Sequence, residues 1–444
     1  MMEGRGQGAG GSTEARTFLS FCCRWMALCV GMSVISLAPC SMVRASSTAE
    51  AAETLVGVAY EPFALPPRVP LAGYSRRKGK PSRGVHDPTG VRALVFDDGV
   101  TTAALVSGDL LIVDEHLFDV VRSRLLKEGL PDRLILILAA THTHSGPGAY
   151  GTKFLEKVSM GHFDPATFEA IIRATVQATV RAYAARSPAR MAYGTAQTDG
   201  LVKNRIDSNG FADTELVVSA FYRPDDNRPF AILADFSAHP TTLGAWNWYL
   251  SGDYPGVVMR ELERRIPGVI ALFFAGSVGD QGPVKVGEGF ERAEWIGMTL
   301  ADQAMTALAA AHPSPPERFA ALQKRFPLPP ARIRLGRFTF PRWLGARLVD
   351  DDATLSIVTI GGAVFFGVPC DLSAELGAIL KRAASAQSLR PVVVGFASDY
   401  VGYCVPAKLY EERQYESSMA FNGPKAGELI VDELIRMMKS AGSG

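Results

Sequence analysis

The sequence has few cysteines outside its first fifty residues and no excess of charge of either sign. Four of the six cysteines lie in that leader, which leaves Cys370 and Cys404 for the rest of the chain. So few cysteines exclude a small fold held together by disulfides. Lys and Arg number 46 and Asp and Glu 45, so no large field of one sign attracts a polyanion. We therefore expect no nucleic-acid partner.

Long linkers, low-complexity runs and internal repeats are also lacking from about residue 55 onward. We therefore expect residues 51–444 to form a single catalytic domain. Its length exceeds the usual range of one hydrophobic core, so two merged lobes would be compatible with it, with Ala310–Pro330 as the candidate seam. Hydrophobic residues make up 47% of the chain, which is enough for a large core.

Residues 1–50 differ from the body in composition. A Gly/Ser-rich start with Arg5 and Arg16 precedes an apolar stretch from Trp25 to Val43, an order typical of a secretory signal. Cleavage near Ala45 is favoured over lipidation at Cys40. An uncleaved N-terminal anchor with a disordered flank is the third alternative, because the stretch approaches the roughly 20 apolar residues that span a bilayer. All three place the body outside the cytoplasm, as a periplasmic, secreted or membrane-anchored protein.

Short apolar runs, rich in β-branched residues and bounded by turn residues, predict buried strands. They are Leu134–Leu138, Phe230–Leu233, Val269–Phe274, Leu355–Ile360, Ala363–Phe366 and Val392–Phe396. A helix is predicted over Pro165–Ala184, where Asp164 can cap and Pro165 suits the first position. The alternation of strands and helices predicts an α/β fold with a large mixed β-sheet core flanked by helices.

Chemically reactive side chains follow these strands within a few residues. They are His142 and His144, His239, the loop Gly276–Asp280, Asp371 and Tyr403. Ligands of layered α/β folds bind outside the carboxyl ends of strands, so these segments can meet. In an extended segment, His142 and His144 would project to the same side. Because zinc prefers imidazole ligands and a catalytic site uses about three protein ligands, the pattern predicts a metal site.

The segment Ala140–Gly148, with the sequence ATHTHSGPG, resembles the His-Thr-His-Ser-Gly-Pro signature of neutral/alkaline non-lysosomal ceramidases. Further similarities follow in the family's order: Asn204-Arg205, Ala238–Thr241, Ser251–Asp253, Phe274-Ala275, Gly279-Asp280, Val368-Pro369, Asp371, Tyr400–Tyr403, Tyr415-Glu416 and Gly423-Pro424. The resemblance covers nearly the whole body. It implies a zinc-dependent hydrolase of linear N-acyl amide bonds that acts on a lipid or other small substrate, with peripheral or N-terminal membrane association compatible with that role.

The resemblance also implies a ligand set for one catalytic Zn²⁺, formed by His142, His239, Asp371 and Tyr403, with His144 beside it. The family has glutamate at the position of Asp371, so the coordination geometry is expected to differ. Each residue also has an ordinary structural alternative. His239 could close a turn, Asp371 could cap a helix, and Tyr403 could belong to the core.

The family's nucleophilic serine aligns with Gly282, which has no side chain that could attack. The expected nucleophile is therefore a water molecule activated by zinc, which lowers the pKa of bound water to about 7. His144 would take its proton. Arg205 and the Tyr403 hydroxyl would stabilise negative charge on the carbonyl oxygen. The alternative for Arg205 is a surface ion pair with Asp207.

Two further segments carry hypotheses. Three alternatives are open for Trp246–Leu250: it lines an acyl channel, contacts a membrane surface or packs in an aromatic core. Cys370 and Cys404 adjoin two proposed ligands and are hypothesised to form a disulfide. Two other functions remain open on the same scaffold: a zinc esterase or other acyl hydrolase, and a binding or cell-surface protein without catalysis.

Overall fold

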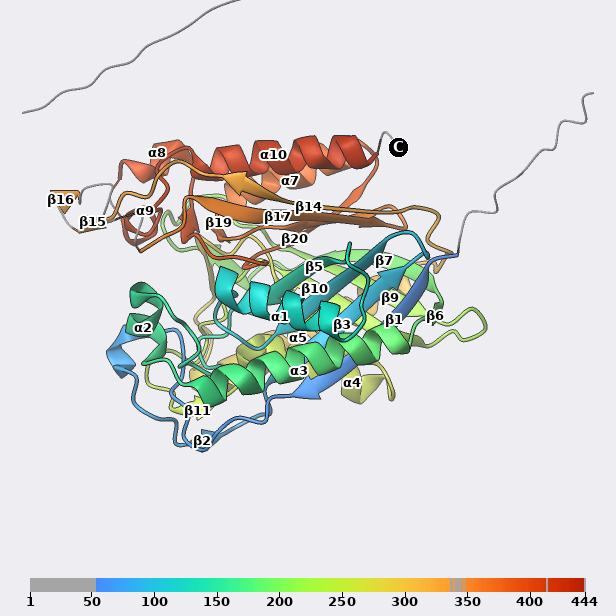
Figure 1. Ribbon diagram of the computed structural model, residues 1–444, viewed down its shortest axis with the longest axis horizontal. Helices are drawn as coiled ribbons and strands as arrows, with labels where there is room; N and C mark the ends of the chain where they lie inside the picture. Colours follow the sequence, from blue (N-terminus) through green and yellow to red (C-terminus); the bar gives the residue numbers. More distant parts are fainter. Residues whose placement is uncertain (1–52, 336–337, 340–344, 346–347, 413, 443–444) are drawn as a thin grey trace, which may run out of the picture. The chain divides into compact units, whose positions relative to one another are not determined.

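The computed structural model describes residues 53–335, 338–339, 345, 348–412 and 414–442 (Figure 1). The expected signal or anchor segment, residues 1–50, lies outside the described residues, so its processing and the export of the body remain predictions. Within the described residues, every helix is too short or too polar to cross a bilayer.

Three mixed β-sheets form the framework of the described body (Figure 1). The first, in the order β5-β4-β3-β1-β6, contains β1 (Leu55–Pro62), β3 (Gly90–Asp97), β4 (Thr102–Gly108), β5 (Ile135–Ala140) and β6 (Ser187–Pro188). The second, in the order β12-β10-β9-β7, contains β7 (Arg190–Gln197), β9 (Glu215–Tyr222), β10 (Pro229–Phe236) and β12 (Ile270–Ala275). The third, in the order β14-β17-β18-β20, contains β14 (Phe319–Pro327), β17 (Asp352–Ile360), β18 (Ala363–Gly367) and β20 (Arg390–Val394).

Each sheet has one parallel pair at an edge, namely β4–β5, β10–β12 and β18–β20, and is otherwise antiparallel. All six predicted strands are present, and the predicted α/β class is confirmed. The expected single large sheet is divided into three. A twisted open sheet of more than about ten strands tends to curl or split, which gives a physical reason for the division.

The inner faces of the three sheets share one hydrophobic core. Phe96 of β3, Phe221 of β9 and Phe365 of β18 all lie in it and are fully buried. Side chains from three regions of the chain therefore fill a single interior, so the three sheets pack against one another through this core. The segment Ala310–Pro330, the candidate seam, contains β14, which pairs along its whole length with β17.

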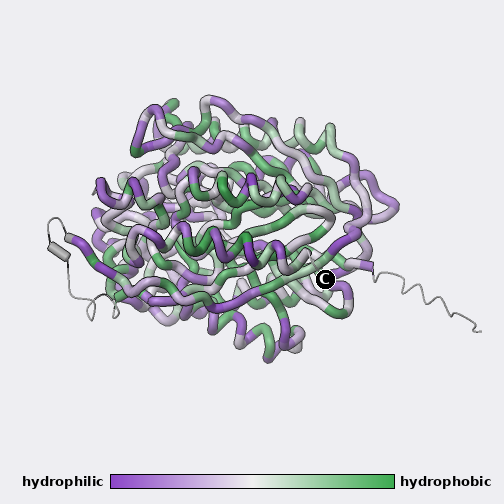
Figure 2. Tube along the Cα trace, turned by 90° about the horizontal axis from the view of Figure 1, so that it is seen from above, coloured by the Kyte–Doolittle hydropathy of each residue, from purple (hydrophilic) through white to green (hydrophobic). Residues whose placement is uncertain are grey.

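Helices cover the outer face of each sheet. They are α1 (Glu115–Lys127) and α3 (Pro165–Ala184) on the first, α4 (Asp253–Arg265) and α5 (Gly289–Ala309) on the second, and α7 (Ala374–Ser385) and α10 (Ala426–Ala441) on the third. Hydrophobic and hydrophilic stretches alternate along the helical tubes in Figure 2, as expected of helices with one buried face. Helix α3 has the predicted bounds, and the Asp164 carboxylate accepts hydrogen bonds from the N–H groups of Ala166 and Thr167.

Several short helices and strands lie in the connections between the main strands and helices. They include η1 (Ser75–Arg77), α2 (Phe154–Met160), α8 (Ala407–Tyr410), α9 (Tyr415–Ser418), β15 (Arg334–Leu335) and β16 (Phe338–Thr339). Three further pairs are β2 (Gly84–Val85) with β11 (Tyr249–Leu250), β8 (Val202–Asn204) with β13 (Gln281–Pro283), and β19 (Asp371–Leu372) with β21 (Tyr403–Cys404). The last pair places two of the predicted ligands, Asp371 and Tyr403, side by side.

Candidate metal centre

Loops from all three sheets meet at one point. His142 follows β5, His239 follows β10 and Asp371 follows β18. The Nε2 atoms of His142 and His239 lie 2.9 Å apart, and each lies 3.7 Å from Oδ1 of Asp371. The Nε2 atom of His144 is 3.2 Å from that of His142. The predicted convergence of these segments is therefore present in the structure.

The backbone brings His142 and His144 together by a different route from the predicted one. His142 has φ 61°, in the left-handed region, so the segment after β5 turns and is not extended. Few non-glycine residues adopt this conformation. The imidazole of His142 stacks on the ring of Phe396, with centroids 3.7 Å apart and planes 6° apart. The turn and this stacking direct the ring into the site.

The hydrogen bonds of the imidazoles leave their Nε2 lone pairs pointing at one another. Nδ1–H of His142 donates to the Leu111 carbonyl at 2.6 Å, and Nδ1–H of His239 donates to the Val278 carbonyl at 3.0 Å. In a neutral imidazole the second nitrogen then carries a lone pair and no proton. Two lone pairs facing each other at 2.9 Å repel, and a cation placed among them relieves that repulsion. His142, His144 and His239 could thus hold a metal ion.

Burial keeps these imidazoles neutral and available as ligands. It lowers the pKa of His142 to about 3 and those of His144 and His239 well below the ordinary value, and the positive charge of Arg205 acts in the same direction. A neutral imidazole is the form that binds a metal. The donor set is therefore ready to bind a cation over the whole neutral pH range.

Asp371 has one carboxylate oxygen without a hydrogen-bond partner. Its Oδ2 accepts a hydrogen bond from the Tyr400 hydroxyl at 2.7 Å, whereas Oδ1 is buried and unpartnered among the described residues. Burial raises the pKa of Asp371 to about 7, against the opposing effects of Tyr400 and Arg205. Asp371 does not cap a helix: the N-cap of α7 is Ser373, and the Ala374 N–H donates to Asp280. A buried carboxylate oxygen facing two imidazoles fits a metal ligand.

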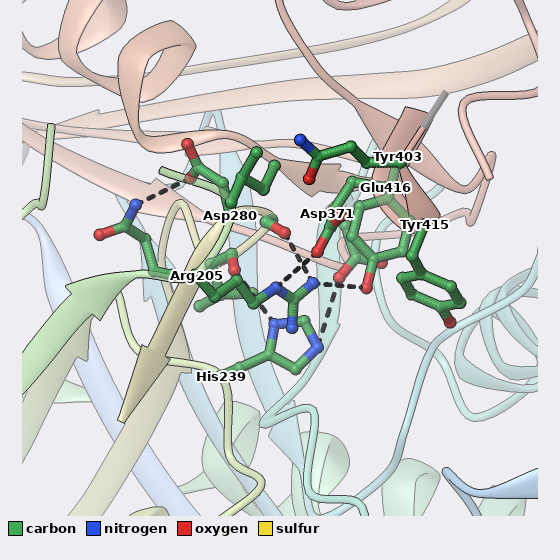
Figure 3. A network of polar contacts seen from close by, with 12 residues as sticks. Arg205, His239, Asp280, Asp371, Tyr403, Tyr415 and Glu416 are labelled. Carbon is green, nitrogen blue, oxygen red and sulfur yellow. Dashed lines mark hydrogen bonds and ion pairs between the residues drawn. The ribbon is translucent and has the colours of Figure 1, made fainter. Parts of the chain in front are cut away.

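Arg205 lies inside the site and not in a surface pair with Asp207. Its guanidinium donates to the Gly279 carbonyl at 2.7 Å and to the Tyr403 hydroxyl at 3.0 Å, and its Nε lies 2.9 Å from Glu416 (Figure 3). The alternative of a surface ion pair with Asp207 is therefore wrong, and Arg205 lies at the site as predicted. The buried carboxylate of Glu416 is the stronger partner, because an exposed ion pair such as one with Asp207 contributes little free energy.

The ring of Tyr403 packs in the protein interior, whereas its hydroxyl faces the site. Its ring packs in a small cluster with Val405 and Tyr410, and its hydroxyl contacts Arg205. Both alternatives from the sequence thus describe part of this side chain, and its role as a ligand remains a prediction. The hypothesised disulfide is not formed, because Cys370 and Cys404 are free, buried thiols that hydrogen-bond to each other.

A cavity of about 320 Å³ opens onto the imidazoles of His142 and His144. Its walls include His142, His144, Asp371, Tyr400 and Tyr403 together with the apolar side chains Leu111, Ile112, Leu155, Val158, Leu348, Val349, Met419 and Phe421. The segment Trp246–Leu250 does not line this cavity, and the side chain of Trp246 is 76% exposed. Trp246 therefore lines neither this cavity nor an aromatic core, and its contact with a membrane surface stays a prediction.

Gly73 provides a test of how tightly His144 is held. Its φ is +105°, and an added Cβ would lie 2.7 Å from the Cβ, Cγ and Nδ1 atoms of His144. We expect Gly73→Ala to displace His144 and to reduce both metal binding and hydrolysis. Gly99→Ala is the matched control, since Gly99 also has positive φ (+80°) but nothing within 4 Å of an added Cβ. Thermal unfolding should show about 1 kcal/mol of backbone strain in each variant, with metal loss confined to Gly73→Ala.

Several residues of this site have no role assigned from the sequence. Tyr400 holds Asp371, Glu416 holds Arg205, and the fully buried Arg77 donates to the backbone carbonyl of His144 at 2.6 Å. Tyr400 and Glu416 lie in segments that resemble the family. That resemblance was the only feature of the sequence that could have pointed to a role at the site. Arg77 sits in a run of basic residues, where nothing distinguishes a buried arginine from exposed ones.

Comparisons with known proteins identify similar sequences and a similar structure. The family model for the N-terminal part of neutral/alkaline non-lysosomal ceramidases matches residues 66–293, just over half of the chain. A neutral ceramidase of Pseudomonas aeruginosa is 29% identical over 233 residues, which make up 48% of this chain and 34% of that protein. One of Mycobacterium tuberculosis is 27% identical over 244 residues, covering 48% of this chain and 37% of that protein.

The matched regions thus span only about a third of the length of these curated relatives. The crystal structure of the Pseudomonas aeruginosa neutral ceramidase superposes with a TM-score of 0.77 at 21% sequence identity, covering 87% of this chain and 75% of that one, and so has the same fold. The resemblance inferred from the sequence motifs is confirmed. The chain belongs to the neutral/alkaline non-lysosomal ceramidase family.

Proposed function

We propose that this protein is a zinc-dependent hydrolase of linear N-acyl amide bonds with a ceramide-like lipid as substrate. One observation carries the proposal. The Nε2 atoms of His142 and His239 and the unpartnered Oδ1 of Asp371 lie close together, and His142 and Asp371 also line a cavity with largely apolar walls. Such a cavity accepts an acyl chain and presents its carbonyl end to the polar donors. Membership in a ceramidase family supports an amide as the bond that is cut.

The polar residues have distinct tasks in this proposal. His142, His239, Asp371 and Tyr403 would hold the zinc ion, which when bound supplies an activated water molecule and polarises the substrate carbonyl. His144, whose Nε2 faces the other imidazoles, is placed to accept a proton and to return it to the leaving amine. Arg205 lies in hydrogen-bond contact with Tyr403 and can stabilise negative charge on the carbonyl oxygen.

Gly282 makes a serine nucleophile at that position impossible, and Ser277 is the nearby serine that has to be tested. The Ser277 hydroxyl is fully buried and has no hydrogen-bond partner in the described part of the chain. We expect Ser277→Ala to keep hydrolysis within about twofold, because it removes an unsatisfied group that does not reach the cavity. Gly282→Ser should fold normally, since an added Cβ would meet only Arg205 carbons at 3.8 and 4.0 Å. A loss of activity in Ser277→Ala with the metal retained would contradict the water route.

Two other functions use the same residues differently. A zinc esterase would attack an ester carbonyl with the same donors, so matched amide and ester substrates of equal chain length distinguish the two. A protein that only binds ligands at a cell surface would show no hydrolysis that a chelator abolishes. The nearly complete donor set favours catalysis over that alternative.

The deciding experiment combines metal analysis of the purified protein with a hydrolysis screen. We expect about one zinc per chain and chelator-sensitive release of fatty acid from N-acyl sphingoid bases, with N-acyl amino acids and simple esters as comparison substrates. Activity without any bound metal would overturn the proposal. The predicted export signal fits a role in the breakdown of extracellular sphingolipids.

A further inference from the structure

One surface segment concentrates positive charge in a chain that is otherwise nearly neutral. Residues 62–86 contain six Lys and Arg and no Asp or Glu. Five of these side chains are exposed and form no ion pair within the part of the chain that the structure describes: Arg68, Arg76, Lys78, Lys80 and Arg83. Because the segment contains no acidic residue, its positive charge is not neutralised locally.

The exposed Trp246 and the half-buried Trp248 lie among these cations. The guanidinium of Arg76 lies 5.4 Å from the ring centroid of Trp246, which is 76% exposed, and that of Arg83 lies 5.7 Å from the ring of Trp248. The two loops are joined by the β2–β11 pair and by a 2.7 Å hydrogen bond from the Arg83 N–H to the Trp248 carbonyl. A shallow surface hollow is lined by Arg68, Lys80, Pro81, Ser82, Arg83 and Trp248, without an acidic side chain. We name the five cations with Trp246, Trp248 and the 43% exposed Tyr249 the basic-aromatic face.

The basic-aromatic face borders the entrance to the acyl cavity. Gly73 and the exposed Ser75, which lie between Arg68 and Arg76 in the chain, line that cavity. The buried Arg77 of the same segment ties it to the site, since it donates to the His144 carbonyl at 2.6 Å and to the Gly244 carbonyl at 3.1 Å. A ligand held on this face therefore lies next to the opening through which an acyl chain would enter.

We propose that the basic-aromatic face docks on an anionic phospholipid bilayer and turns the cavity entrance toward the lipid. This step rests on the proposed lipid substrate. The cations are spread over a surface and do not converge on one point, which suits an array of headgroups better than a single soluble anion. Exposed Trp and Tyr side chains prefer the membrane interface, where the ring is half in hydrocarbon and half in water. Docking here would deliver the substrate without carrying it through water.

The test is vesicle sedimentation of the full chain. Phosphatidylcholine vesicles containing phosphatidylglycerol should bind the protein, pure phosphatidylcholine vesicles should bind it far more weakly, and added salt should release it. Each cation near an anionic surface contributes roughly a fivefold gain in binding, so the triple variant Arg76→Gln/Lys78→Gln/Lys80→Gln should bind about 100-fold more weakly. Trp246→Ala should weaken binding without changing its salt dependence.

The matched control removes three equally exposed cations beyond the opposite ends of the strands, in Lys127→Gln/Arg133→Gln/Arg318→Gln. This variant should sediment like the parent. Equal binding to both vesicle types, equal loss in the control, or displacement by soluble glycerol phosphate or heparin as effectively as by lipid would overturn the proposal. Hydrolysis of a soluble short-chain amide should be unchanged in the Arg76/Lys78/Lys80 variant. If that amide is not hydrolysed by the parent while sedimentation behaves as expected, the proposed function fails and the docking surface stands.

Discussion

His239→Ala is expected to lose both the bound zinc and the hydrolytic activity. The Nε2 lone pair of His239 lies 2.9 Å from that of His142, and its Nδ1–H is fixed by the Val278 carbonyl. Because a bound metal contributes several kcal/mol to stabilising the transition state, hydrolysis should fall at least ~10³-fold. Metal content by mass spectrometry and initial rates on a short-chain amide measure both effects.

His142→Ala should behave in the same way, since its ring provides the central nitrogen of the group. His312→Ala is the control, because His312 is exposed and distant in sequence from each proposed ligand. Circular dichroism and thermal unfolding in the presence of chelator separate loss of the metal from loss of the fold. A His239→Ala protein that is folded and still binds zinc as the parent does would refute the proposed ligand set.

Asp371→Asn is expected to weaken zinc binding by at least ~10²-fold while leaving the fold intact. Asparagine has the same shape but no charge, and Asp371 is the only carboxylate among the proposed ligands. The neutral imidazoles of His142 and His239 and the nearby Arg205 cation would then face a divalent ion with little compensating negative charge. Competition with a chromophoric chelator gives the affinity directly.

Tyr400→Phe provides a graded comparison for Asp371. It removes the 2.7 Å hydrogen bond to Oδ2 but keeps the carboxylate, so zinc affinity should fall ~10-fold, as is usual when the partner of a ligand is removed. Tyr193→Phe, which loses only a bond to the Pro391 carbonyl away from the site, should change nothing. If Asp371→Asn and Tyr400→Phe both bind zinc as tightly as the parent, Asp371 is not a ligand.

Local sequence patterns predicted most of the elements but not how they combine. Helix α3 was predictable to the residue because its cap, first-position proline and apolar spacing all lie within the segment itself. The positions of His142 and His239 after buried strands were enough to predict that they meet. The division into three sheets was not predictable, since apolar runs do not reveal which strands pair.

Features that depend on distant contacts escaped sequence reasoning. The left-handed turn at His142 is stabilised by stacking on Phe396, which lies more than 250 residues later in the chain. Arg205 carries a charge that can pair locally with Asp207, yet the fold brings it to Glu416. Burial and the packing of remote segments determine which of these contacts form, and a local sequence pattern does not predict them.

The common interior of the three sheets means that no portion of the chain can assemble the donor set alone. The region matched by the family model ends at residue 293, whereas Asp371, Tyr400 and Tyr403 come from segments that follow strands of the third sheet. A fragment that stops before β14 would keep the imidazoles but lack the anionic donor, and would leave the side of the shared interior that the third sheet covers open to water. Occupancy of the centre should therefore report on global folding: the ion should be released in the same transition in which the protein unfolds, at a temperature that rises with free zinc concentration.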